Sequence, residues 1–220
     1  MRFLCLSDIH GHFAALSAAL EFGAILGFDQ LVVCGDLCFP GPEPLRVWTT
    51  ISSHKALCVQ GVADRAVASL NPNRLAESSG VEHPRVQRLR QARAELGDLI
   101  LARLAKLPTM ARLPVESGDT MLVVHGSPAD PTEPFTHDMS DDEVDALLGE
   151  DSADLVVCGG SHVPFDRVVS QVRVINVGSV GEAPGGEVAH LTVVETTPFG
   201  VTITQHEAPL DSVGQERRLS

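Results

Sequence analysis

The stretch MRFLCLSDIHGH (residues 1–12) carries the strongest indication of the fold. Its first six residues form a short, mostly apolar run, which is typical of a buried strand. The run ends at Ser7 and leads directly into Asp8, His10 and Gly11. Because extended backbone points residues i and i+2 to the same side, Asp8 and His10 are expected to face one point. A carboxylate and an imidazole held in this way present one oxygen and one nitrogen to a single metal ion.

The same arrangement, an apolar run that ends in glycine with Asp or His, recurs along the chain. The runs 30–34, 56–60, 120–124 and 155–158 lead into Gly35-Asp36, Gly61-Val62-Ala63-Asp64, His125-Gly126-Ser127 and Gly159-Gly160-Ser161-His162. One such piece alone is more often a turn or a helix cap. Neighbouring strands lie about 4.8 Å apart, so groups at the same end of adjacent strands converge. Ligand crevices of α/β sheets lie outside these carboxyl ends, and five pieces in order predict one shared site. Asp36 is expected to add a second carboxylate whose two oxygens bridge two ions.

Helical patterns alternate with the strand candidates, which predicts an α/β protein. Helices are expected over 13–26, 45–53 and from Pro84 to about residue 107, and a capping box at Ser140–Glu143 predicts another through Leu148. The apolar stripe of the long helix is formed by Leu89, Ala92, Leu96, Leu99, Ile100 and Leu104. Strands are further expected over 172–177, 188–194 and 201–205, the last two as a hairpin.

No composition break divides the chain, so we expect a single domain over residues 1–208. Within it, residues 67–107 form a helical insert and a candidate lid. Arg85, Arg88, Arg90 and Arg93 crowd the start of its long helix. They form either a solvated surface or the face of a lid that meets an anionic substrate. Residues 209–220 lack apolar periodicity and are expected to be a loose tail.

The composition is that of an ordinary globular protein with an acidic surface. The 220 residues include 44% hydrophobic and 20% charged residues, with a net charge of −13. A chain of this size can bury about 70% of its surface, enough for one core without disulfides. The acidic balance argues against nonspecific nucleic-acid binding and against anionic membranes. No run approaches the ~20 apolar residues that span a bilayer, and the start lacks a signal-peptide pattern.

The cysteine usage indicates a reducing compartment. There are five cysteines, an odd number, and four lie in or beside apolar strand candidates. We therefore expect reduced, mostly buried thiols in a soluble, cytoplasmic protein.

With these motifs in view, the chain resembles the calcineurin-like metallophosphoesterases, in particular the compact prokaryotic phosphodiesterases. The matching segments are SDIHGH (7–12), CGD (34–36), GVAD (61–64), HGSP (125–128), GGSHVPF (159–165) and INVGSVG (175–181). They cover almost the whole chain in the family's order. The resemblance implies a four-layer α-β-β-α sandwich, in which helices flank two mixed β-sheets, and a two-metal site at the strand ends.

The ligands that the resemblance implies are complete for one ion and incomplete for the other. The first site would use Asp8, His10, Asp36 and His162. The second would use Asp36, an asparagine at position 62, His125 and a histidine at position 160, but the chain has Val62 and Gly160. Such ligands suit Mn²⁺, Fe²⁺, Zn²⁺, Co²⁺ or Ni²⁺. We therefore expect one firmly bound ion and a second that is weak or depends on substrate.

Three further residues are candidates on the same resemblance. Asp64 matches the acid of the family's Gly-Asn-x-Asp motif and joins the catalytic set, as a partner behind the ligands rather than a direct proton donor. His12 stands at the start of the first helix, where it has either a substrate or metal role or a surface or capping role. Arg65 either meets phosphate or pairs with Asp64 or another neighbouring acid.

The function implied is metal-dependent hydrolysis of phosphodiesters or phosphomonoesters by a metal-activated hydroxide. The expected substrates are small phosphate esters or nucleotides. The sequence does not decide between a monomer and a homo-oligomer. The alternative is a catalytically impaired family member that binds one metal and a nucleotide or a protein partner. This alternative rests on Val62 and Gly160, which replace two metal ligands of the family pattern.

Overall fold

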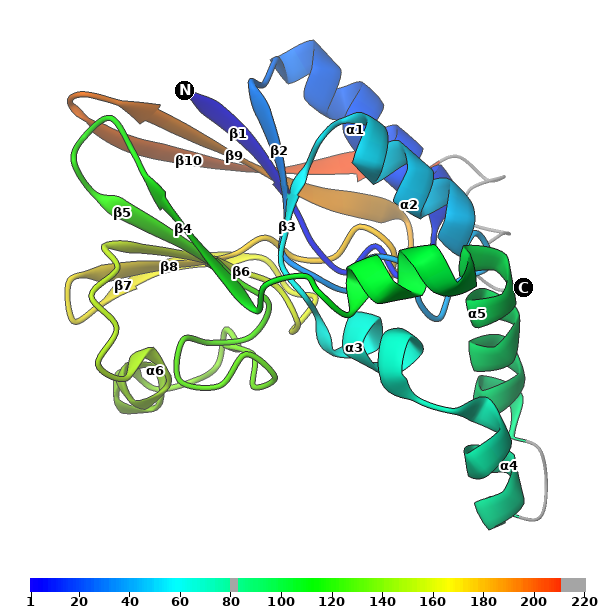
Figure 1. The fold of residues 1–220 in the computed structure, drawn as a ribbon. Coiled ribbons are helices and arrows are strands. Elements are labelled where there is room, and N and C mark those ends of the chain that lie inside the picture. Colours follow the sequence, from blue (N-terminus) through cyan, green and yellow to red (C-terminus); the bar gives the residue numbers. More distant parts are fainter. Residues whose placement is uncertain (80–82, 211–220) are drawn as a thin grey trace.

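Two five-stranded mixed sheets form the centre of the protein (Figure 1). The computed structural model describes residues 1–79 and 83–210. The first sheet has the order β10 (Gly200–Pro209), β9 (Val188–Thr197), β1 (Arg2–Leu6), β2 (Gln30–Val33) and β3 (Leu57–Cys58). The second has the order β4 (Met110–Pro114), β5 (Thr120–Val124), β6 (Leu155–Cys158), β8 (Val172–Asn176) and β7 (Phe165–Val169).

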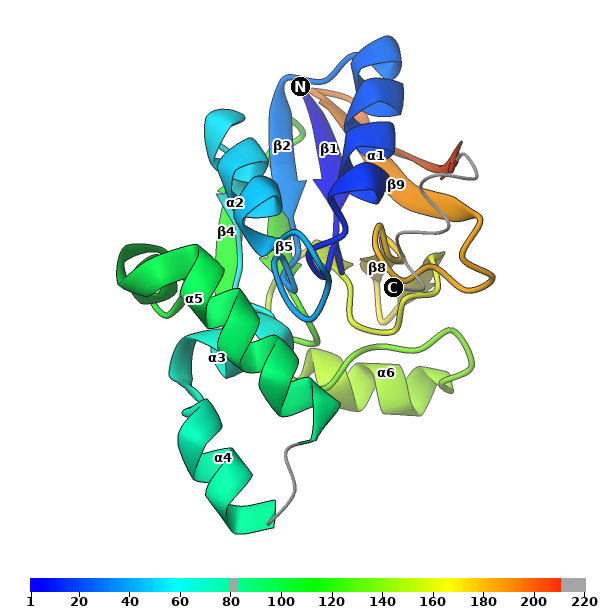
Figure 2. The ribbon, with the colours of Figure 1, turned by 90° about the vertical axis from the view of Figure 1, so that its right-hand side faces the viewer.

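The inner strands β1, β2, β5 and β6 are almost entirely apolar because they are covered on both faces. In β1, Phe3 and Cys5 point into the core between the two sheets, where they join Val157 and Ile175 of the second sheet. Leu4 and Leu6 point the other way, into the core under the helices. The outer face of the first sheet is covered by α1 (Phe13–Leu26) and α2 (Pro44–Ser53), and that of the second by α6 (Asp141–Leu148) (Figure 2). The predicted four-layer α-β-β-α sandwich is confirmed.

The connection between β3 and β4 is the predicted helical insert, formed by α3 (Val62–Ser69), α4 (Pro72–Ser79) and α5 (Pro84–Leu104). The predicted stripe of α5 is wrong at one position. Gly97 has non-helical angles (φ 69°, ψ 165°) and kinks the helix, which shifts the buried face. Leu99 is therefore 69% exposed, and Leu101 is buried in its place. Helices α3 and α4 and strands β4 and β7 were not anticipated from the sequence.

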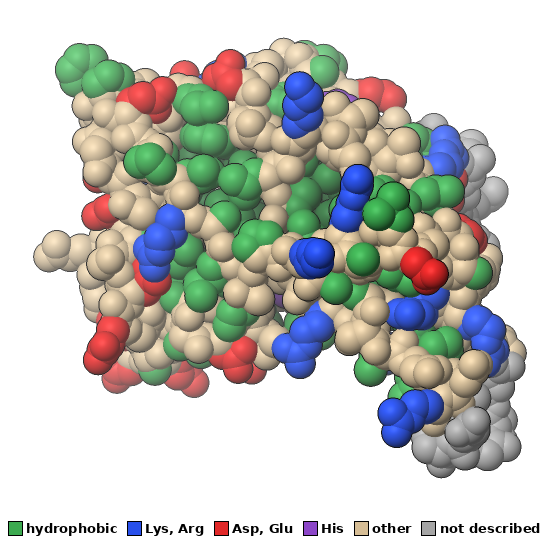
Figure 3. Space-filling view, in the orientation of Figure 1, with side chains coloured by type: hydrophobic (Ala, Val, Ile, Leu, Met, Phe, Trp, Pro, Cys, Tyr) green, Lys and Arg blue, Asp and Glu red, His purple; other side chains and the backbone are tan. Residues whose placement is uncertain are grey.

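Two arginines of α5 hold the insert together. Arg93 donates hydrogen bonds to the carbonyl oxygens of Val67 and Ala68 at the end of α3, and Arg90 donates to Asn73. Figure 3 shows Lys and Arg side chains gathered over this helical part of the molecule. The arginines thus join the helices to one another, and a lid movement of the insert stays a prediction.

The remaining expectations concern the chain end and the membrane. Strand β10 continues to Pro209, one residue into the predicted tail, and the amide of Leu210 donates to the carbonyl oxygen of Glu187. Residues 211–220 lie outside the described residues. Within the described part of the chain, no helix combines the length and the apolar character needed to cross a membrane.

Parallel pairing brings the carboxyl ends of the key strands to one edge of the sandwich. β1 pairs in parallel with β2, and β5 pairs in parallel with β6. The loops after these strands then bond to one another across the two sheets. The amide of Gly160, after β6, donates to Oδ2 of Asp8, after β1, over 2.9 Å.

Candidate metal centre

The five predicted ligand side chains converge at this edge. Nε2 of His162 lies 3.2 Å from Oδ1 of Asp8, and Nε2 of His10 lies 3.7 Å from the same oxygen. The two imidazole Nε2 atoms are 3.4 Å apart. Oδ2 of Asp36 lies 3.5 Å from Nε2 of His125 and 3.8 Å from Nε2 of His10. Two overlapping triads result, Asp8–His10–His162 and Asp8–Asp36–His125, with the ligand atoms of each triad within 4.8 Å of one another.

The spacing of the first triad suits one cation. Ligand atoms about 2.1 Å from an ion in tetrahedral geometry stand roughly 3.4 Å apart. Oδ1 of Asp8 is fully buried and, among the described residues, receives no hydrogen bond in bonding geometry. An unpaired carboxylate oxygen inside a protein is costly unless a cation or donor compensates it. The residues present therefore fit a divalent metal ion.

Backbone carbonyls orient two of the three imidazoles. Nδ1 of His10 lies 2.7 Å from the carbonyl oxygen of Phe39, and Nδ1 of His125 lies 2.8 Å from that of Cys34. A carbonyl accepts only, so each Nδ1 carries the proton and each Nε2 presents its lone pair to the centre. This is the tautomer that a metal requires.

The electrostatics of the centre also favour a positive charge. Burial acts to raise the pKa of Asp8, yet contact with His162 and the charges of His125 and His10 hold it below its ordinary value. Contact with Asp8 raises the pKa of His162. For His125, the Asp36 and Asp8 charges outweigh burial and raise its pKa. The carboxylates thus attract protons to their neighbours, and a cation can take the place of those protons.

The backbone under the first-site ligands is strained. Asp8, His10, Asp36 and His162 all adopt left-handed conformations, with φ between 51° and 63°. Such angles are uncommon outside glycine and cluster at functional sites, where the surrounding structure enforces them. Here the enforcing bonds run between loops, for example from the amide of Asp8 to the carbonyl oxygen of Gly35 over 3.1 Å.

Asp64 lies behind Asp36 and holds it in place. It is fully buried, Oδ2 accepts from the amides of Asp36 and Gly61, and Oδ1 accepts from the amide of Leu37. Burial and then the Asp36 charge raise the pKa of Asp64 to about 7. Asp64 thus fixes the backbone on either side of Asp36, and its catalytic role stays a prediction.

The two oxygens of Asp36 face different partners. Oδ1 accepts a hydrogen bond from the amide of Ala63 over 2.7 Å. Only Oδ2 faces His10 and His125. Whether Asp36 bridges two ions stays a prediction.

The part of the centre around Asp36 and His125, where the second ion is expected, has no side-chain ligand at positions 62 and 160. Val62 begins α3 and is 47% exposed, so an apolar side chain stands at the open edge of the centre. Gly160 has φ +80°, and a Cβ there would lie 2.9 Å from Cβ of Pro134 and 3.6 Å from Nε2 of His125. The backbone of Gly160 thus passes close to the second site without contributing a side chain.

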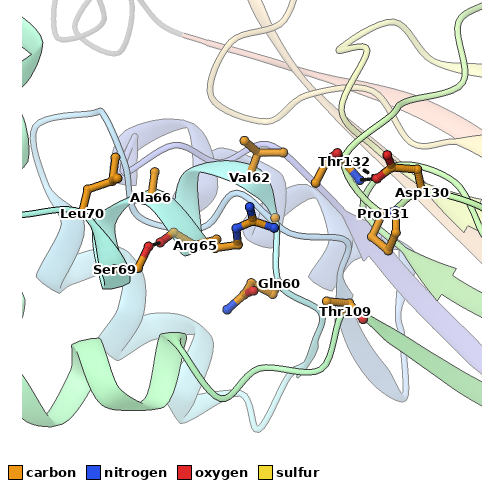
Figure 4. Close-up of a pocket in the computed structure, with 11 residues that line it drawn as sticks. Gln60, Val62, Arg65, Ala66, Ser69, Leu70, Thr109, Asp130, Pro131 and Thr132 are labelled. Carbon is orange, nitrogen blue, oxygen red and sulfur yellow. Dashed lines mark hydrogen bonds between the residues drawn. The ribbon is translucent and has the colours of Figure 1, made fainter.

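A cavity of about 520 Å³ opens beside Val62. Figure 4 shows Arg65 of α3 reaching into it, across from Asp130 and Thr132. Asp130 accepts bonds from Thr132 that, with a weaker contribution from Arg65, lower its pKa. The acid near Arg65 is therefore Asp130, and the alternative pairing with the buried Asp64 is not formed.

His12 occupies the N-cap position of α1 but makes no side-chain capping bond, so the capping interpretation is wrong. A Cβ on Gly181 would lie 2.9 Å from Cδ2 of His12, which places its ring against the loop 178–182. Asn176 shapes that loop, because it donates to the carbonyl oxygen of Gly159 and to Oγ of Ser161, and accepts from the amide of Gly178.

Sequence patterns did not reveal Glu182 or the cavity residues Asp130 and Thr132. Oε2 of Glu182 lies 3.8 Å from Nε2 of His10 and 3.9 Å from Nδ1 of His162. Glu182 follows directly after the matched segment INVGSVG (175–181), and this adjacency was the available signal.

The fold and the centre define an α/β sandwich protein with a metal-binding cluster at its strand ends. Residues 1–198 match the calcineurin-like phosphoesterase superfamily domain, and the chain belongs to this family. No curated protein matches the sequence.

Solved structures share the fold at low identity. The hypothetical protein PH1004 from Pyrococcus horikoshii OT3 is 20% identical, with a TM-score of 0.85 over 99% of this chain and 92% of that one. A metallophosphoesterase from Sphaerobacter thermophilus is 21% identical, with a TM-score of 0.79 over 100% and 92%. Vps29 from Entamoeba histolytica, complexed with Zn²⁺, is 13% identical, with a TM-score of 0.52 over 96% and 100%.

Proposed function

We propose that this chain is a metal-dependent phosphoesterase that hydrolyses small phosphodiesters or phosphomonoesters, nucleotides included. The observation that carries the proposal is the first triad, in which Asp8, His10 and His162 present ligand atoms at 3.2–3.7 Å from one another. The buried Oδ1 of Asp8, which among the described residues receives no hydrogen bond in bonding geometry, supports it, and so does membership of a phosphoesterase family.

The ion would be held by Asp8, His10, Asp36 and His162. A divalent ion at such a site supplies positive charge to phosphate oxygens and lowers the pKa of water. Mn²⁺ is one of the ions that a mixed carboxylate and imidazole set accepts. His125 and Asp36 would offer a second ion two protein ligands, so its occupancy would be weak or dependent on substrate.

The chain's own residues would bind and orient the ester. Asp64 would fix the position of Asp36, because its carboxylate accepts hydrogen bonds from the amides of Asp36, Leu37 and Gly61. The cavity beside Val62 offers a positive guanidinium, a hydroxyl and a carboxylate. A volume of about 520 Å³ lies within the range of small-molecule sites, roughly 300–1,000 Å³. We assign Arg65 to substrate binding in this cavity. We also assign His12, at the N-terminus of α1, to substrate binding.

The compartment proposed is the cytoplasm. All five cysteines are free thiols and four of them are buried. Burial raises the pKa of Cys5 to about 12, so this thiol stays protonated and unreactive. Such usage is typical of a reducing environment.

A second candidate function rests on Val62 and Gly160. With two second-site side chains absent, the protein would keep one ion and bind a nucleotide or a protein partner without turnover. The structural likeness to Vps29 is compatible with this alternative.

Hydrolysis of bis-p-nitrophenyl phosphate in Mn²⁺ distinguishes the two candidates. We expect turnover by the unaltered protein and its loss in Asp36→Asn. Asp145→Asn, which neutralises an exposed carboxylate on α6, is the matched control and should stay active. No turnover by folded, metal-loaded protein with any of the five candidate ions would overturn the phosphoesterase proposal in favour of the binding function.

A further inference from the structure

Glu182 lies in a loop that is bonded directly to the loop carrying Asp8 and His10. The amide of Val180 donates to the carbonyl oxygen of Ser7 over 3.0 Å, and the amide of Gly181 donates to that of Asp8 over 2.9 Å. The amide of Glu182 then donates to Oγ of Ser179 over 2.7 Å, and this hydroxyl in turn donates to the carbonyl oxygen of Asp8. The backbone of Glu182 is therefore fixed relative to the metal centre.

The close approach of the two loops also depends on Gly181. A Cβ at this position would lie 2.1 Å from the carbonyl oxygen of Ile9, closer than any real contact allows. A glycine here lets the two backbones touch, and the next side chain, Glu182, is then carried to the rim of the centre.

The Glu182 carboxylate points at the first site. Its Oε2 lies 3.8 Å from Nε2 of His10 and 3.9 Å from Nδ1 of His162, and its side chain is 40% exposed. Within the described part of the chain, these two histidines are the basic groups within 4 Å of it. Among the described residues, the Glu182 carboxylate therefore forms no ion pair with an arginine or lysine.

Nε2 of His10 is surrounded by carboxylate oxygens at nearly equal distances. It lies 3.7 Å from Oδ1 of Asp8, 3.8 Å from Oδ2 of Asp36 and 3.8 Å from Oε2 of Glu182. Two ligand atoms about 2.1 Å from one ion are separated by no more than roughly 4.2 Å. Glu182 thus lies as near to Nε2 of His10 as Asp36 does, and it approaches the first triad from outside, on the Nδ1 side of His162.

We propose that Glu182 is a further ligand of the ion in the first site, on its solvent-facing side. The inference rests on the metal site of the proposed function and adds a residue to it. With neutral imidazoles, Asp8 and Asp36 balance the charge of one divalent ion, and Glu182 adds a third carboxylate. The centre, which lacks side-chain ligands at Val62 and Gly160, thereby concentrates its ligands on a single ion.

The test is Mn²⁺ binding by titration calorimetry, measured without any substrate. Glu182→Gln removes the charge and keeps the size, and Glu182→Ala removes the carboxylate altogether. Loss of even an indirect partner of a metal ligand costs about 10–100-fold in affinity, so we expect at least about tenfold weaker binding in both variants. Glu187→Gln, an exposed glutamate five positions along, makes the same change in net charge and should bind Mn²⁺ as the unaltered protein does.

Thermal unfolding of the metal-free variants controls for folding, and we expect no change because the side chain is partly exposed. Wild-type Mn²⁺ affinity in both Glu182 variants would overturn the inference, whatever the activity. Weaker binding in the variants of a protein that hydrolyses no ester would support the inference while the phosphoesterase proposal fails. A protein that binds no Mn²⁺ or Zn²⁺ at all would overturn both.

Discussion

The two halves of the metal centre differ in how the protein holds them. In the first half, Asp8, His10 and His162 sit on left-handed backbone, and bonds between loops fix that backbone. In the second half, His125 is equally well oriented by a backbone carbonyl, but positions 62 and 160 carry an isopropyl group and a hydrogen atom. The first half thus has every side chain that the family resemblance implies, whereas the second keeps Asp36 and His125 but has no side-chain ligand at positions 62 and 160.

The rest of the centre is built without side-chain ligands at positions 62 and 160. Val62 lies at an exposed helix start, where the fold does not depend on a particular side chain. Gly160 still donates its amide to Oδ2 of Asp8, so its backbone serves the first half. The buried bonds that shape the centre, including those of Asp64, stay in place.

The largest expected effect concerns Asp8, which belongs to both triads. Asp8→Asn removes the buried charge that both halves share, so we expect at least about 100-fold weaker Mn²⁺ binding and no measurable hydrolysis. Titration calorimetry and the bis-p-nitrophenyl phosphate assay measure the two effects. Near-normal Mn²⁺ affinity in a folded Asp8→Asn protein would contradict a centre built around this carboxylate.

A smaller, asymmetric effect is expected when one histidine is removed from each half. His162→Ala should abolish tight binding of the first ion, because it removes one of three closely spaced ligands. His125→Ala should leave the tight ion bound, with an affinity reduced about tenfold or less, since His125 belongs to the half with fewer side-chain ligands. Metal content per chain after gel filtration checks the difference. Equal losses in the two variants would show that the halves are not distinct in strength.

The smallest effects are expected from restoring the second half. Val62→Asn offers an amide oxygen at the edge of the centre and should raise the affinity for a second Mn²⁺ several-fold. Val62→Ala is the matched control, because it removes the isopropyl group and adds no ligand. If the asparagine variant binds a second ion no better than the alanine variant, position 62 does not limit the site.

Restoring position 160 should cost stability, because φ is +80° and a Cβ would crowd Pro134. A non-glycine residue in such a conformation costs about 1–3 kcal/mol. We therefore expect lower melting temperatures for Gly160→Ala and Gly160→His, and only the histidine variant should bind more metal. Unchanged melting temperatures in both would show that the loop relaxes freely.

Local signals in the sequence predicted most of the fold. The apolar runs that end in glycine with Asp or His correspond to β1, β2, β5 and β6, and the predicted capping box opens α6 with both of its bonds formed. Strand β4 was missed because its sequence, MARLP (110–114), is not an apolar run. Exposed and half-buried residues alternate along it, and one of them is charged. The phase of α5 was missed after Gly97, because periodicity alone does not indicate where a glycine leaves the helix.

The sequence by itself determined the class of fold, the candidate ligands after each strand and the departures from the family's pattern at positions 62 and 160, because these depend on residue type and near neighbours. Only the tertiary structure decided which atoms meet. It placed Glu182 beside His10, bonded one Asp36 oxygen to the amide of Ala63, and set Arg65 in a cavity with Asp130. The physical reason is that these contacts join segments far apart in the chain, and their distances follow from the packing of the two sheets and the bonds between their loops.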